Sequence, residues 1–175
     1  MTLTPPESRS FFKMYLPLLH YAYSSKHADV TFRQFKSLKI AEKISAQEIL
    51  FDEIDLIDKH IADNRFDSQR KDDLLGIKKH VRGRFFVLKH LSRYSVFMKT
   101  NKRKLYGVIG LSDELGVVLP FVPILINGVL FNFRNKLVCD GLITLENVSF
   151  GPGIRRGLNE EYKVLKEIDG ISVVL

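Results

Sequence analysis

The spacing of apolar residues changes near residue 83, and this change limits what the chain can fold into. Before it, apolar residues recur every three or four positions, as Phe11, Tyr15 and Leu18 do, which is the period of an amphipathic helix. After it, short runs of β-branched and aromatic residues such as "RFFVLKHL" and "YSVFMKT" are separated by turn residues, which is typical of strands. Helices followed by strands indicate an α+β fold.

We therefore predict a helical N-terminal region over residues 1–82 and a β-rich region with a C-terminal helix over residues 83–175. No Ser- or Pro-rich linker separates the two, so we expect them to pack as one unit. The predicted architecture is a group of N-terminal helices packed on a bent, mainly antiparallel β-sheet or small barrel, with one C-terminal helix.

Four helices are predicted in the first region. The first covers residues 7–23, with a kink or break just before Pro17, which lacks a backbone N–H and clashes with the preceding turn. Thr31 and Gln34 form a capping pair for the second helix, near residues 32–43.

Ser45 and Glu48 give the clearest helix start, because the serine oxygen can accept an amide N–H three residues on while the glutamate reaches back to the serine amide. Asp67 or Ser68 caps the fourth helix, and Gly83 is the expected stop.

The second region contains two predicted hairpins. "RFFVLKHL" pairs with "YSVFMKT", and "VPILINGVLFNF" pairs with "KLVCDGLITL" through a turn at "RNK", while "KLYGVIGL" supplies a further strand. Glycines at positions 107, 110, 128 and 141 indicate bulges or tight bends, as in a small curved sheet or barrel. At the end of the chain we expect a glycine-rich loop at "FGPGIRRG", a short helix capped by Asn159, and an edge strand at "ISVV".

The net charge of +7 is placed unevenly. Residues 74–112 hold ten Lys or Arg and no Asp or Glu, which leaves 17 basic and 20 acidic residues elsewhere. Clustered cations create a local field that attracts anions, and nucleic acids are bound by cations together with aromatic rings that stack on bases. The candidate nucleic-acid or anion-binding residues of this segment are Arg82, Arg84, Lys89, Arg93, Lys99, Lys102, Arg103 and Lys104.

Two other interpretations of this basic segment stay open. Lysines at the edge of a solvated sheet discourage aggregation and need no ligand. An acidic protein surface would also fit the charge, and the chain's own acidic stretch at residues 48–73, with nine Asp or Glu against four Lys or Arg, could neutralise it internally.

The stretch "GPGIRRGLNEE" is a second candidate anion site. Its glycines permit close backbone approach, and Arg155 and Arg156 supply fork-shaped donors just before a predicted helix start. Glu160 and Glu161 would oppose an incoming anion, and the spacing matches neither phosphate-binding fingerprint. The alternative is a structural loop whose arginines pair with these glutamates.

Nothing in the sequence indicates a metal or another cofactor. The five histidines are scattered, with no paired His at helical spacing and no His–Cys cluster. Cys139, the single cysteine, lies in the apolar run "KLVCDGLI" and is predicted to be a small buried hydrophobe.

From Val81 onward the chain contains, in this order, the stretches "VRGRFFVLKHLSRYSVFM", "LYGVIGLSD", "CDGLI" and "FGPGIRRGLNEEY". In these stretches it resembles a family of prokaryotic proteins to which no activity is assigned. The resemblance implies a recurrent module in the C-terminal half, and it implies no catalytic residues.

These features favour a noncatalytic binding protein for DNA, RNA or an acidic protein surface, of a kind that would fit a phage, plasmid or defence system. One alternative is an enzyme that acts on a phosphorylated or carboxylated small molecule between the two regions, with Asp113 or Asp140 beside the arginine loop. Another is an oligomeric assembly protein that exposes "VVLPFVPILI".

The sequence does not fix the oligomeric state. It shows no signal-peptide pattern and no apolar run long enough to span a membrane, so we expect a cytoplasmic protein.

Overall fold

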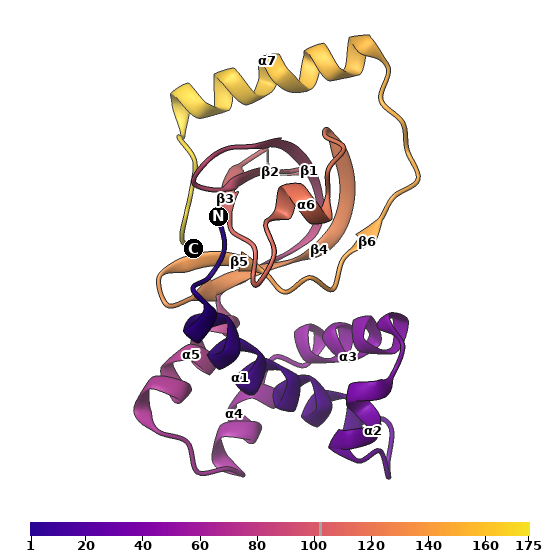
Figure 1. Cartoon of the computed structure of the whole chain (residues 1–175), viewed down its shortest axis with the longest axis vertical. Coiled ribbons are helices and arrows are strands. Elements are labelled where there is room, and N and C mark those ends of the chain that lie inside the picture. The colour runs from indigo at the N-terminus through magenta and orange to yellow at the C-terminus, as the bar shows by residue number, and fades with distance from the viewer. Residues whose placement is uncertain (102) are drawn as a thin grey trace. The chain divides into compact units, whose positions relative to one another are not determined.

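The computed structural model describes residues 1–101 and 103–175, and these form two compact units. One unit comprises residues 5–79 and is helical; the other comprises residues 1–4 and 80–175 and contains a curled antiparallel sheet with a C-terminal helix (Figure 1). The predicted α+β class, with a bent antiparallel sheet, is therefore confirmed.

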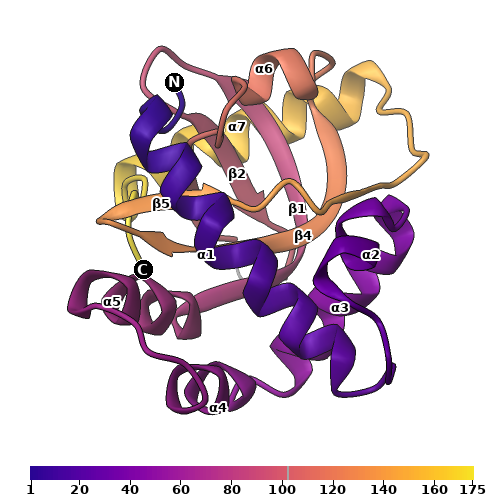
Figure 2. The ribbon, with the colours of Figure 1, turned by 60° about the horizontal axis from the view of Figure 1, so that its bottom comes forward.

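The helical unit is arranged around its first helix, which contacts each of the other four. The side chains of Phe11, Tyr15 and Leu18 are fully or almost fully buried on the packed face of this helix. Figure 2 shows the long first helix crossing the view with the shorter helices beside it. The five helices are α1 (Pro5–Ser24), α2 (Phe32–Ser37), α3 (Ile40–Asp52), α4 (Leu56–Ala62) and α5 (Ser68–Lys78).

Two of the predicted helix starts are confirmed and one is wrong. Thr31 and Gln34 form a capping box before α2, and the side chain of Asp67 accepts a 2.7 Å hydrogen bond from the amide of Arg70 at the start of α5. Ser45, however, lies inside α3. That helix begins at Ile40, because the carboxylate of Glu42 accepts the amide of Lys39 at 2.9 Å and supplies the start five residues earlier.

Two predicted interruptions were also wrong. Helix α1 runs without a break through Pro17. An interior proline costs about 3 kcal/mol, but burial of Leu18 and Leu19 beyond it contributes about 1.5–3 kcal/mol each and favours continuation. Helix α5 ends at Lys78, and Gly83 is not its stop but a residue of the first strand with φ of 136°.

The sheet unit has the strand order β3-β2-β1-β4-β5, with β6 paired to β4. Both predicted hairpins are confirmed: β1 pairs with β2, and β4 pairs with β5 through Arg134 and Asn135, whose positive φ values suit a tight hairpin turn. The strands are β1 (His80–His90), β2 (Ser95–Lys99), β3 (Leu105–Val108), β4 (Ile124–Phe133), β5 (Lys136–Cys139) and β6 (Thr144–Leu145).

The sheet curls until its two edge strands meet. Beyond β3, the amide of Ile109 donates to the carbonyl of Leu137 in β5 at 3.0 Å. The C-terminal tail runs beside β3, where the amide of Gly107 donates to the carbonyl of Ser172 at 2.9 Å. The predicted edge strand at "ISVV" is thus reduced to a single parallel bridge between Tyr106 and Ser172.

The inside of this curl holds the main core of the unit. Phe85 and Val87 of β1 point inward together with Phe97 of β2. The short helix α6 (Leu115–Val118) adds Leu115 and the following Leu119 to the same cluster. Cys139 belongs to this core, and burial raises the pKa of its thiol to about 12, as expected for an unreactive buried cysteine.

The outer face of β1, β2 and β3 is covered by helix α7 (Pro152–Ile168), which appears in yellow in Figure 1. Leu158 and Tyr162 of α7 pack against Leu88, Val96 and Met98. The sequence prediction of a loop at "FGPGIRRG" followed by a cap at Asn159 was wrong here. The helix begins at Pro152, because a proline in the first turn has no N–H to lose and a φ already suited to a helix.

Glycines of the sheet unit differ in how much space surrounds them. A methyl group at Gly110 would overlap the backbone carbonyl of Asp113, whereas Gly157 of α7 has open space around the same position. We predict that Gly110→Ala destabilises the fold by about 1–3 kcal/mol, while Gly157→Ala stabilises it by about 0.5–1 kcal/mol. Denaturant unfolding of both variants measures this. A loss of stability in Gly157→Ala would contradict the helical assignment of the "GPGIRRG" stretch.

His60 is the buried histidine of the helical unit, 5% exposed between the rings of Tyr21 and Phe66. Burial holds the pKa of His60 below its ordinary value, against the opposing attraction of Asp63. Below about pH 6.5 the unfolded chain therefore binds a proton that folded His60 resists, so stability is lost as the pH falls toward the folded pKa.

We predict that this acid-dependent loss is smaller in His60→Gln than in the parent chain. Denaturant unfolding at pH 7.5 and pH 5.5 measures the difference, and an NMR titration of the His60 ring gives its pKa directly. A ring that titrates above pH 6.5 would contradict the assignment.

Candidate anion-binding site

A β-bulge in β1 decides which way Lys89 points. Val87 pairs with Phe97 and Lys89 pairs with Val96, so Leu88 is an extra residue without a partner across the strands. Such a residue reverses the alternation of side chains along a strand. Lys89 therefore lies on the outer face with Leu88, beneath α7, instead of entering the core beside Phe85 and Val87.

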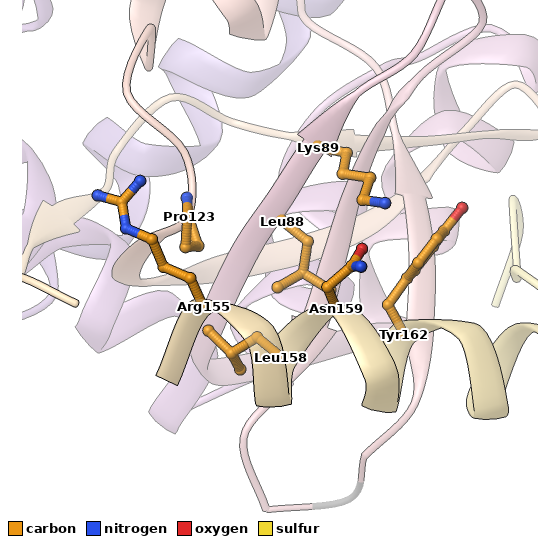
Figure 3. A pocket seen from close by; sticks show the side chains of 7 residues that line it. All are labelled: Leu88, Lys89, Pro123, Arg155, Leu158, Asn159 and Tyr162. Atoms are coloured by element: carbon orange, nitrogen blue, oxygen red, sulfur yellow. The ribbon is translucent and has the colours of Figure 1, made fainter. Parts of the chain in front are cut away.

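A pocket of about 170 Å³ lies between this bulge and α7. In Figure 3, Arg155 and Pro123 lie at one end, Lys89 and Tyr162 lie at the other, and Leu88 and Asn159 lie between them. The walls are apolar where Leu88, Pro123 and Leu158 line them. Two of the cations predicted from sequence, Lys89 and Arg155, thus flank one small cavity.

The polar groups around this pocket keep donors for a ligand. Lys89 places its ammonium 4.4 Å from the ring centroid of Tyr162, and Arg155 uses Nε to donate to the carbonyl of Phe150 at 2.8 Å. Within residues 1–101 and 103–175, neither cation forms an ion pair, and the amide of Asn159 has no hydrogen-bond partner. An anion can therefore accept hydrogen bonds from the ammonium of Lys89, from both terminal nitrogens of Arg155 and from the side-chain amide of Asn159.

The carboxylates expected to oppose an anion lie elsewhere. Because α7 begins at Pro152, Glu160 and Glu161 belong to its third turn and not to its N-terminus. Glu161 makes a 3.1 Å ion contact with Arg103, without the alignment of a hydrogen bond, and Glu160 is exposed. No acidic residue lines the pocket in the part of the chain that the structure describes.

Several of the other predicted cations are engaged by the protein itself. Arg84 forms a bidentate ion pair with Glu146, at 2.6 and 2.7 Å. Lys99 donates from Nζ to the carbonyl of Arg82 at 2.9 Å, and both residues take part in further interactions. All three residues belong to β1 and β2, and none of them lines the pocket.

The remaining predicted cations are dispersed. Lys104 lies over the ring of Tyr106, 5.8 Å from its centroid, beside Arg103 in the turn between β2 and β3. Arg93 lies in the turn at the opposite end of β2 and lines a different cavity. Arg156 is exposed on α7, and Lys102 lies outside the described residues.

Sequence reasoning missed the contributions of Asn159 and Tyr162. Together with Arg155 and Lys166 they follow the spacing i, i+4, i+7 and i+11, which places them along one side of a helix. Proline at the first helical position was the available signal for this helix start. Because the "GPGIRRG" segment was predicted to be a loop, the position of Arg155, Asn159 and Tyr162 on one side of a helix was not recognised.

The acids proposed for an enzymatic alternative do not line this pocket. Asp140 is buried and accepts the amide of Leu142 at 3.1 Å, which is an Asx-type turn contact, and Asp113 is exposed. Among the described residues, no three His, Cys, Asp or Glu side chains gather as metal ligands.

Comparison with known proteins gives no family and no relative: no family model, curated protein or solved structure matches this chain. In the described part of the chain, every helix is too short or too polar to cross a bilayer.

Proposed function

We propose that this protein is a noncatalytic nucleic-acid-binding protein that holds a phosphate of DNA or RNA in the pocket between β1 and α7. The observation that supports the proposal is the pairing of Lys89 and Arg155 across one cavity, with the free amide of Asn159 between them. Arginine, lysine and amide donors together suit an anion with several oxygens.

The size of the pocket favours a group of a larger partner over a whole small molecule. Sites for small molecules have volumes of roughly 300–1,000 Å³, and this pocket has about 170 Å³. A phosphate attached to a chain that continues across the surface fits this volume.

The spacing of cations along the side of α7 next to the pocket favours a ligand with repeated anionic groups. Arg155 and Lys166 stand eleven residues apart on it, which is about 16 Å at 1.5 Å per residue. One strand of duplex DNA has a phosphate about every 3.4 Å along the helix axis, so this distance spans roughly five nucleotides. No carboxylate occupies the positions of this side between them, which are Asn159 and Tyr162. An acidic protein surface is the runner-up partner.

Fluorescence anisotropy with labelled 20-mer oligonucleotides, single- and double-stranded, tests the proposal. The double variant Lys89→Gln/Arg155→Gln should weaken binding at least tenfold at 50 mM salt, because two phosphate contacts are lost. Its plot of log K against log salt should become less steep by about 1.4–1.8, since each of the two lost contacts contributes about 0.7–0.9 to the slope.

The matched control is Lys13→Gln/Arg33→Gln, which removes the same charge from exposed positions of the helical unit. An equal loss in the control, no binding at low salt, or binding that persists at 1 M salt would contradict the proposal. Displacement of the oligonucleotide by poly-glutamate at equal charge would favour the acidic protein partner instead.

The assembly alternative keeps one supporting observation. Val117 of α6 is 72% exposed and Phe121, just after it, is 82% exposed, which is unusual for apolar side chains so close in a chain. If this segment joins copies of the protein, Phe121→Asp should convert an oligomer into a monomer without loss of folding. Sedimentation of both proteins measures this, and a parent chain that is already monomeric at high concentration would exclude the alternative.

A further inference from the structure

Another cavity of the sheet unit lies where the curled sheet closes. It has a volume of about 340 Å³ and lies next to the junction at which Ile109 meets the strand of Leu137. The C-terminal tail supplies Val173 to its lining, and the turn between β1 and β2 supplies Tyr94. This is twice the volume of the pocket between β1 and α7, which is called the phosphate pocket below, and it falls within the range of small-molecule sites.

The lining of this cavity is mostly apolar, and its charged side chains are cationic. Ile109, Leu137, Val173 and the ring of Tyr94 provide the apolar surface, and Arg93 and Lys136 are the charged side chains. Arg93 makes no ion pair among the residues that the structure describes. Met1, which also lines the cavity, has its amino group paired with Glu114 at 3.0 Å.

The packing around Gly107 gives this cavity a defined wall. A methyl group on Gly107 would approach the ring of Tyr94 at 2.9 Å and Val173 at 3.0 Å, so both side chains close over the bare backbone of β3. The tail that carries Val173 is held on either side: Ser172 bonds to β3, and Leu175 exchanges two hydrogen bonds with Asn132 of β4, at 3.0 and 3.1 Å. Hydrogen bonds on both sides of Val173 therefore hold the tail in place at this wall of the cavity.

We propose that this cavity binds a small amphipathic carboxylate, with its apolar chain against Ile109, Leu137 and Val173 and its carboxylate on the guanidinium of Arg93. Burial of the chain supplies about 0.8 kcal/mol per methylene, and the arginine fork supplies selectivity for the anion. The site is separate from the phosphate pocket and does not depend on nucleic-acid binding.

Isothermal titration with octanoate and with octan-1-ol as its uncharged counterpart tests the proposal. Octanoate should bind saturably at one site and more tightly than octan-1-ol. Arg93→Gln should weaken octanoate binding about tenfold and leave octan-1-ol binding unchanged. Arg33→Gln, an equal charge change at an exposed position of the helical unit, should affect neither ligand.

A second variant fills the cavity. Val173→Trp should abolish the binding of both ligands, and an unchanged melting temperature of the ligand-free variant shows that it folds. In the parent chain, octanoate should shift the methyl NMR signals of Ile109, Leu137 and Val173 selectively. The proposal is overturned if octanoate binds without saturation, if octan-1-ol binds as tightly as octanoate, or if Arg93→Gln has no more effect than Arg33→Gln.

Discussion

Strand β1 has to bury apolar side chains on both of its faces, and the sheet unit is organised by this requirement. Phe85 and Val87 enter the core inside the curl, while Leu88 packs outward against α7. A strand buried on both sides needs a cover on each, and here the curled sheet provides one and the amphipathic helix provides the other. The bulge at Leu88 then moves the next residue, Lys89, to the outer face, so the same requirement creates the cationic pocket.

Local signals in the sequence predicted those parts of the fold that depend on neighbouring residues. The capping pair of Thr31 and Gln34 and the turn at Arg134 and Asn135 act over three or four residues, and both were predicted correctly. The bulge in β1 and the start of α7 were not predicted. The bulge depends on which residue of β2 faces Lys89, and strand pairing of this kind is not encoded in a local pattern. The start of α7 did have a local signal in Pro152, but the glycines around it favoured a loop, and the helix is stabilised by Leu158 and Tyr162 packing on strands more than fifty residues away.

Cations that are clustered in the sequence of the basic segment are dispersed over the folded surface. Its ten cations form one block along the chain, yet an antiparallel hairpin sends consecutive parts of the block to opposite ends and opposite faces. Arg84 is neutralised by Glu146, and Lys99 is used by a backbone carbonyl. The exposed Arg84–Glu146 pair contributes only about 0–1 kcal/mol to stability, but it reduces the positive charge that Arg84 offers to an external anion. The candidate site therefore includes one cation from the block and one from a helix that lies far from it in sequence.

The pocket of Lys89 and the cavity of Arg93 both lie where regular hydrogen bonding is interrupted. The pocket of Lys89 adjoins an extra residue in β1, and the cavity of Arg93 adjoins the junction of β3 and β5, where a single bridge closes the sheet. A regular ladder places side chains side by side about 5 Å apart and leaves little room between them, whereas a bulge or an incomplete junction separates neighbouring side chains. Apolar walls and cations meet at these two places, where flanking segments cover β1 and β3. Substitution of a residue on these flanking segments, such as Arg155 on α7 or Val173 on the tail, can therefore change which ligand binds without disturbing the inner core.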